Sequence, residues 1–158
     1  MKKSKTAWTI LCLTFFFICN NCSAQTNKDP ELTAVRKVIE RNNVRYFDLF
    51  SNKDESIVNL YTEDACLLVP NTPAICGGGA LAKDFKDTYA SGKIKGVKFV
   101  TLNVYGDGKA YVTEEGTWQV FDPEGRVLDD GKYLKLWKKT KEGWKIFRDL
   151  FNSDHSGK

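Results

Sequence analysis

The spacing of apolar and polar positions divides the chain into a helical first half and a strand-rich second half. Between residues 30 and 50, apolar side chains recur every three or four positions, the period of a helix with one buried face. The inward positions are Val35, Val38, Ile39, Asn42, Tyr46, Leu49 and Phe50. Asp29-Pro30-Glu31 supplies a cap acceptor, a first-turn proline and an acidic residue. The pattern therefore predicts a first helix from about residue 30 to Phe50.

Two shorter helices and one strand are expected between residues 57 and 92. Apolar positions at 57–61 predict the inner face of a second helix. Residues 65–69 form a short apolar run that two prolines end, which indicates a strand. After the glycines at 77–79, Leu81, Phe85 and Tyr89 fall on one helical face. A third helix is therefore expected, ending near residue 92.

The remainder of the chain has the composition of strands. Segments 95–105, 109–121, 126–138 and 144–152 are rich in β-branched and aromatic residues. Short connections that contain glycine separate them, and such connections favour hairpins. We expect an α+β fold in the order α-α-β-α-β-β-β-β, in which three N-terminal helices cover one face of a strongly curved antiparallel sheet.

The first 24 residues have the features of an export signal. Three lysines precede an apolar run at 7–18, and small residues at 22–24 suit cleavage before Gln25. The run is too short to span a membrane as a helix. We therefore expect an exported protein, periplasmic or secreted, with no membrane attachment after cleavage. Its parts would be a short segment at 25–31, one domain at 32–153 and a tail at 154–158.

Removing this leader changes the charge and the cysteine count. The whole chain has 24 basic and 20 acidic residues, and the leader carries three lysines and no acid, which leaves 21 − 20 = +1. A nearly neutral domain does not indicate a nucleic-acid partner. The lysines around the last hairpin, at 135, 138, 139, 141 and 145, are interpreted as a solvated turn. Cys66 and Cys76 remain, and the sequence leaves open whether they form a disulfide or stay free.

Several local motifs occur together in an order that resembles a known superfamily. They are Tyr46 within RYFDLF, the junction at 61–65, the segment 70–75 with Gly77, the run 131–134 and the ending at 143–153. Over about residues 32–153 the chain resembles the nuclear-transport-factor-2-like (NTF2-like) superfamily, and within it the SnoaL-like, ketosteroid-isomerase-like domains of the DUF4440 type. The resemblance implies a cone-shaped sheet around an apolar pocket, and a homodimer formed through the outer sheet face.

The same resemblance identifies which isomerase positions have changed. The isomerases of this superfamily use an aspartate base before the proline that ends the first strand, a tyrosine on the first helix, and a second acid on a later strand. In this chain the base position is Val69, and the second acid position falls at Lys132 or Tyr133. Only Tyr46 matches. A steroid-type proton shuttle is therefore not supported.

The remaining candidate chemistry rests on carboxyl groups and phenols. The only histidine is His155, near the end of the chain, so neither a catalytic triad nor a histidine metal site is expected. Asp149 and Tyr46 are the candidate catalytic residues. Asp149 could act as a general base or as a structural acceptor for Tyr46 or for backbone groups. Arg148 and Asp149 are neighbours on a strand and should point to opposite faces.

Glu114 has two readings that the sequence leaves open. It shares strand parity with Trp118, so both line the pocket or both lie on the outer face. The expected ligand-binding residues are Tyr46, Val69, Asn71, Glu114, Trp118, Tyr133, Arg148 and Asn152, with no metal or cofactor. The predicted function is binding of a small apolar or amphipathic molecule, with a weak ketosteroid-isomerase-like or related lyase or hydratase activity left open. The alternative is a non-enzymatic dimerisation or partner-binding module with a filled core.

Overall fold

The structure, a computed structural model, describes residues 30–155 of the 158-residue chain. The expected export signal and the helix cap at Asp29 lie outside these residues. The elements in order are α1 (Pro30–Ser51), the 3-10 helix η1 (Glu55–Leu60), β1 (Tyr61–Leu68), β2 (Ile75–Cys76), α2 (Gly78–Ser91), β3 (Gly96–Gly106), β4 (Tyr111–Phe121), β5 (Val127–Thr140) and β6 (Gly143–Ser153).

The strands form one six-stranded sheet in the order β2-β1-β6-β5-β4-β3. The four long strands β3 to β6 pair in sequence as the expected antiparallel meander. β1, however, pairs with β6 in the parallel direction. The expectation of a purely antiparallel sheet was therefore wrong. No hairpin joins β1 to β6, since most of the chain lies between them, so no turn requires the two strands to run in opposite directions.

The helices differ from the expected set in one place. α1 and α2 occur close to where the pattern put them, although Asn43 rather than Asn42 lies on the buried face of α1. The expected second α-helix is instead the short 3-10 helix η1, which buries Ile57 and Leu60 three residues apart. β1 then begins at Tyr61, and β2 is a strand that the sequence pattern did not indicate.

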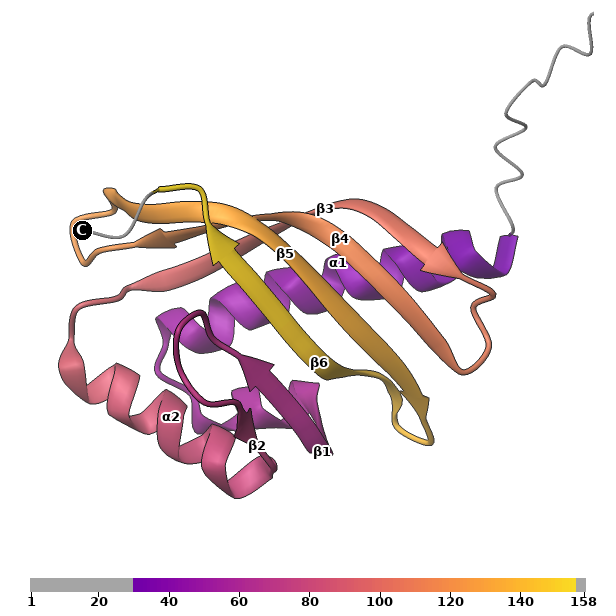
Figure 1. Cartoon of the computed structure of the whole chain (residues 1–158), viewed down its shortest axis with the longest axis horizontal. Coiled ribbons are helices and arrows are strands. Elements are labelled where there is room, and N and C mark those ends of the chain that lie inside the picture. The colour runs from indigo at the N-terminus through magenta and orange to yellow at the C-terminus, as the bar shows by residue number, and fades with distance from the viewer. Residues whose placement is uncertain (1–29, 156–158) are drawn as a thin grey trace, which may run out of the picture.

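The two α-helices cover different parts of the sheet. α1 packs along β3, whereas α2 packs against β1 and η1, as Figure 1 shows. The main core lies between these layers and is rich in aromatic rings, including Tyr46, Phe50, Phe85 and Tyr89. A smaller cluster around Trp118 and Tyr133 continues it along the sheet. In residues 30–155 neither α-helix combines the length and apolar character that crossing a membrane requires.

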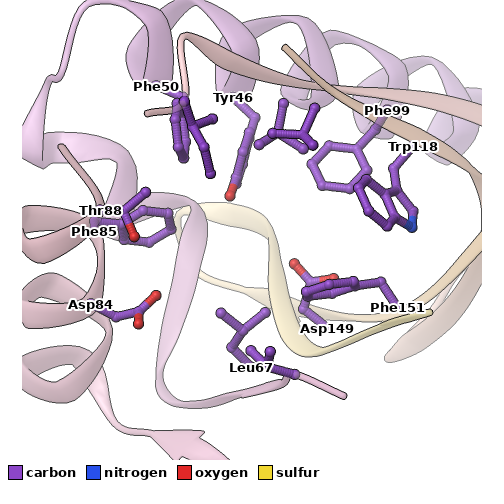
Figure 2. A pocket seen from close by; sticks show the side chains of 14 residues that line it. Tyr46, Phe50, Leu67, Asp84, Phe85, Thr88, Phe99, Trp118, Asp149 and Phe151 are labelled. Carbon is purple, nitrogen blue, oxygen red and sulfur yellow. The ribbon is translucent and has the colours of Figure 1, made fainter. Parts of the chain in front are cut away.

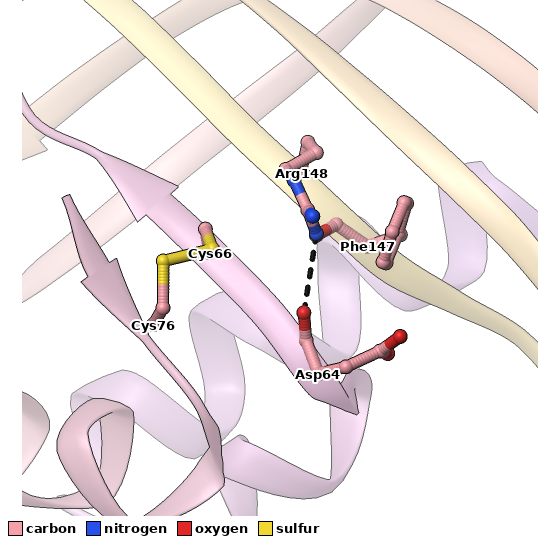
Figure 3. The surroundings of a disulfide bond; sticks show 5 residues. All are labelled: Asp64, Cys66, Cys76, Phe147 and Arg148. Carbon is pink, nitrogen blue, oxygen red and sulfur yellow. Dashed lines mark hydrogen bonds between the residues drawn. A yellow bond between two sulfur atoms is a disulfide. The ribbon is translucent and has the colours of Figure 1, made fainter.

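A disulfide joins the two shortest strands. Cys66 on β1 and Cys76 on β2 face each other in register, with an S–S distance of 2.06 Å. Figure 3 shows this bridge beside the strand that carries Arg148. The question that the sequence left open is thus answered in favour of pairing. The bridge closes the segment that leads from β1 through β2 to the start of α2.

A glycine on the concave face makes space for an aromatic ring. Gly116 on β4 lies opposite Tyr133 on β5, and a Cβ added at Gly116 would be 2.5 Å from the Tyr133 ring and 2.3 Å from the Val100 carbonyl oxygen. Real Cβ atoms do not approach other atoms so closely. The absence of a side chain at Gly116 therefore allows the Tyr133 ring to lie across β4.

Replacing Gly116 by alanine should destabilise the protein. Because the added methyl group would overlap both a ring and a backbone oxygen, we expect Gly116→Ala to lower the free energy of unfolding by about 1–3 kcal/mol. Gly79→Ala is the matched control, since no atom lies within 4 Å of the added Cβ and the residue is in α2. There the same change should be neutral or stabilise by up to about 1 kcal/mol. Urea unfolding of both variants measures the difference, and equal stabilities would contradict the packing argument.

Candidate functional site

An apolar cavity of about 370 Å³ opens between the two α-helices and the inner face of the sheet. Six aromatic side chains form most of its wall, and Figure 2 shows them around the central space: Tyr46, Phe50, Phe85, Phe99, Trp118 and Phe151. The polar groups at the wall are few. They are Asp84 and Thr88 on α2, Asp149 on β6 and the hydroxyl of Tyr46. A largely apolar cavity with a few polar groups is typical of a small-molecule site.

Three ionisable residues lie in one row next to this cavity. Glu114 on β4 pairs with Lys135 on β5, and Lys135 pairs with Asp149 on β6. Their exposed fractions are 0%, 0% and 2%. Residues that pair directly across neighbouring strands project from the same face of a sheet, so the three side chains all point to the inner face. The row is therefore a polar strip inside an otherwise apolar interior.

Glu114 has a complete set of hydrogen bonds. Its Oε1 accepts from Asn43 Nδ2 at 2.7 Å, Thr101 Oγ1 at 2.6 Å and the Tyr133 hydroxyl at 2.6 Å. Its Oε2 accepts from Trp137 Nε1 at 2.9 Å. These donors come from α1, β3 and β5. Glu114 thus faces inward, as one of the two readings held, but it joins the elements of the core and does not line the cavity.

Asp149 is only half satisfied. Its Oδ2 accepts a hydrogen bond from the Tyr61 hydroxyl at 2.9 Å, whereas its buried Oδ1 has no hydrogen-bond partner among the described residues. Burial raises the pKa of the Asp149 carboxyl, and the nearby Lys135 opposes that rise. The sequence analysis named Tyr46 or backbone groups as possible donors to Asp149, and the structure shows that the donor is Tyr61. Burial also raises the pKa of the Tyr46 phenol, and a hydrogen bond with Tyr61 opposes this.

Lys135 is fully buried, so its interpretation as part of a solvated turn was wrong. Its Nζ lies 4.0 Å from Asp149 Oδ2, beyond hydrogen-bond distance, and has no acceptor among the described residues. It lies 3.1 Å from the centroid of the Phe99 ring. Burial lowers the pKa of the Lys135 amine, and attraction to Asp149 and Glu114 opposes the change. Since the loss of hydration is the larger effect on both Lys135 and Asp149, the pair is shifted toward its neutral forms.

The structure places some of the expected site residues at the cavity wall and the others elsewhere. Val69 and Trp118 line the cavity together with Tyr46 and Asp149, and Tyr133 lies in the hydrogen-bond network around Glu114. Burial, followed by the charge of Glu114, raises the pKa of the Tyr133 phenol. The four lining residues come from α1, β4, β6 and the position that follows β1, so the cavity depends on contacts between distant parts of the chain.

Arg148, Asn71 and Asn152 do not line the cavity, which corrects the expectation for these three residues. Arg148 donates to the Asp64 carbonyl oxygen at 3.1 Å, as Figure 3 shows, and its guanidinium lies over the Phe147 ring. Asn71 and Asn152 are exposed, and the side chain of Asn152 donates to the Ser153 carbonyl oxygen. The bulge in β6 and the alternation of the strand place Asp149 inward and its neighbour outward.

Sequence reasoning missed Lys135, Asp84, Thr88 and Phe99. For Lys135 the signal was present, because it alternates with Tyr133 and Trp137 along β5 and therefore shares their face. Its proximity to four other lysines in the sequence obscured that signal. Asp84 is next to Phe85 on α2, but only the position of this helix over β1 brings its carboxyl to the cavity. Burial raises the pKa of the Asp84 carboxyl.

Among the described residues, one group has the spacing of metal ligands. This group lies where β5 begins and β6 ends, and its possible ligand atoms, from Asp129, Asp130 and His155, are within 4.8 Å of one another. The His155 ring nitrogen lies 2.7 Å from Asp130 Oδ1, and this contact raises the pKa of the imidazole. His155 is exposed. A surface ion pair accounts for the geometry, so we assign no metal to it.

The sequence matches no family profile, and it matches no curated protein. Solved structures provide the likeness instead. A ketosteroid isomerase-like protein from Erwinia carotovora atroseptica is 18% identical with a TM-score of 0.63, covering 81% of this chain and 99% of that chain. An NTF2-like protein with a cystatin-like fold from Novosphingobium aromaticivorans is 18% identical with a TM-score of 0.65, covering 87% and 94%. This chain has the NTF2-like fold. A third NTF2-like structure, from Salmonella enterica, is 15% identical with a TM-score of 0.61, covering 78% and 94%.

These structures confirm the likeness to the NTF2-like superfamily that the sequence motifs indicated. Identities below one fifth establish the fold and leave the activity open, because one fold carries many functions. The narrower assignment to the SnoaL-like and DUF4440 groups stays a prediction. Within the NTF2-like fold, the row of Glu114, Lys135 and Asp149 is the feature of this chain that needs a physical explanation.

The role of Glu114 as a structural acceptor can be tested by changing one atom. Glu114→Gln replaces an acceptor oxygen by an amide that must face a donor, so we expect a loss of roughly 2–4 kcal/mol in the free energy of unfolding. Glu115→Gln is the control, because Glu115 lies on the outer face and accepts from Tyr105 at the surface. That change should stay within about 0.5 kcal/mol. If chemical denaturation gave both variants the same stability, Glu114 would not organise the core.

Proposed function

We propose that the protein binds a small apolar or amphipathic molecule in the cavity between the helices and the sheet. The observation that carries this proposal is the pairing of an aromatic cavity wall with a buried carboxyl oxygen, Asp149 Oδ1, that has no partner among the described residues. Such an oxygen is expensive to bury unless a ligand or water completes its hydrogen bonds. A ligand with an apolar body and one hydroxyl or carbonyl group would satisfy both features.

Binding accounts for the site better than isomerase chemistry does. Val69 lines the cavity at the position where the isomerases have their base, and its side chain cannot carry a proton. Any proton transfer in a lyase or hydratase reaction would rest on Asp149, aided by the phenol of Tyr46. The ketosteroid isomerase-like structure from Erwinia has the same fold, which supports a ligand pocket in this location. The export signal expected at residues 1–24 would make this an extracytoplasmic binding protein, periplasmic or secreted.

Binding should be measurable with 2-naphthol, which has two fused rings and one hydroxyl group. At a concentration one hundred times its Kd, a ligand stabilises the folded state by about 2.7 kcal/mol, so the melting temperature should rise by several degrees. Val120→Phe adds volume at the cavity wall and should reduce that rise. Val44→Phe is the control, since Val44 is 64% exposed on α1. If 2-naphthol, 1-decanol and a steroid all leave the melting temperature of the wild-type protein unchanged, the proposal fails.

A second candidate function is assembly into a homodimer through the outer face of the sheet. Val100, Leu102, Leu134 and Leu150 are each about half exposed, at 46%, 48%, 46% and 46%. Leu134 on β5 and Leu150 on β6 are direct partners, so these two side chains adjoin on the outer face of the sheet. Exposed apolar surface on a sheet is a common site of association. This role does not require the cavity to be filled, so it is compatible with ligand binding.

A charge placed at the centre of this surface should prevent a dimer from forming. We expect light scattering to give twice the chain mass for the wild-type protein and the mass of one chain for Leu134→Lys, because two lysines would be buried near the symmetry axis. Val44→Lys, on the exposed side of α1, should leave the mass unchanged from that of the wild type. A monomeric wild-type protein at high concentration would remove this second function.

A further inference from the structure

We propose that Lys135 is a reactive amine that forms an imine with an apolar aldehyde or ketone held in the cavity. The inference rests on the proposed binding function and specifies the ligand class for the same site. Three observations support it: the position of the amine next to the cavity, the absence of an acceptor for it within residues 30–155, and the acid beside it.

The amine lies directly behind the cavity wall. Its Nζ contacts Phe99 and Asp149 and lies 5.3 Å from the centroid of the Tyr46 ring. All three of these side chains line the cavity. A single layer of side chains thus separates Nζ from the space that a ligand would occupy. The lysine stem has four rotatable carbon units, which allow the amine to move across this distance.

Lys135 differs from every other lysine in residues 30–155, because it is the only buried one. A charged ammonium in this position would have lost its hydration without gaining a hydrogen bond. Burial accordingly lowers the pKa of the amine. A neutral amine in an apolar site is the form that attacks carbonyl carbon, so the surroundings of Lys135 select the reactive form.

Asp149 supplies the acid that the reaction requires. The Lys135 nitrogen attacks the carbonyl carbon, a C–N bond forms, and one amine proton moves to the former carbonyl oxygen. The resulting carbinolamine then loses its hydroxyl group, which takes a proton from the Asp149 carboxyl and leaves as water. The products are a protonated imine on Lys135, one water molecule and the Asp149 carboxylate. Burial raises the pKa of the Asp149 carboxyl, which favours the protonated form that this step uses.

The product has a favourable charge arrangement. The positive charge of the protonated imine would lie next to the Asp149 carboxylate, which retains the Tyr61 hydrogen bond. The aromatic wall favours a ligand whose carbonyl group is conjugated to a ring or a chain of double bonds. The expected ligand class is therefore an unsaturated or aromatic aldehyde or ketone, bound with its carbonyl group toward β5 and β6.

The test uses cinnamaldehyde and cyanoborohydride, which reduces an imine to a stable amine. The purified protein is treated at neutral pH, and intact mass and peptide mapping locate the adducts. We expect one main adduct at Lys135, formed at least about tenfold faster than at any other lysine of residues 30–155, because it is the only one of these that is buried. Lys135→Met should lose this adduct, whereas Lys141→Met, in the exposed turn, should keep it. Asp149→Asn should slow the formation of the adduct.

The outcomes separate this inference from the binding function. Cinnamyl alcohol has the same body and no carbonyl group, so it should raise the melting temperature and compete with the aldehyde without labelling the protein. If cinnamyl alcohol binds but cinnamaldehyde labels only surface lysines, the cavity binds ligands and the proposed amine chemistry is wrong. If neither compound binds and Lys135 is not labelled, the binding function fails as well. The wild-type labelling pattern decides the point even if Lys135→Met does not fold.

Discussion

Burial of three ionisable side chains in one row across β4, β5 and β6 is the constraint on which the rest of the structure depends. A charged group inside an apolar interior is tolerated only with partners or by becoming neutral. Glu114 has partners from three elements, so that α1, β3 and β5 are held around it. Lys135 and Asp149 have few partners and are shifted toward their neutral forms. The same row therefore contains both a structural anchor and a pair of unsatisfied groups.

The difference between these two ends corresponds to their positions relative to the cavity. The satisfied end, Glu114, is enclosed by Asn43, Thr101 and Tyr133 and makes no contribution to the cavity wall. The unsatisfied end is at the cavity wall: Asp149 lines the cavity, and Lys135 lies just behind it. Native proteins rarely leave buried polar atoms without partners except where function requires it. This contrast supports our proposal that a ligand binds at the β6 end of the row.

The sequence was sufficient for the α+β class and for most of the elements, because these depend on repeated local patterns. The helical period of α1 and the alternation of the four long strands extend over many residues, and the motifs around Tyr46 and Tyr133 agreed with them. The parallel pairing of β1 with β6 was not predictable in this way, since no local signal records which distant strand becomes a neighbour. The site was predicted in part: Tyr46, Val69, Trp118 and Asp149 do line the cavity. Lys135 was misread because local charge density was given more weight than strand parity.

The Cys66–Cys76 bridge gives the cavity a dependence on its chemical surroundings. Leu67 and Val69 belong to the cavity wall, and both lie in the loop between the two bridged cysteines, which are ten positions apart. A cross-link of this kind limits the conformations open to the enclosed segment. In an oxidising compartment one side of the cavity is thus fastened covalently to β2, whereas in a reducing one the same wall would be held only by the non-covalent contacts of β1 with β2, β6 and α2. The shape available to a ligand is in this respect a property of where the chain folds as well as of its sequence.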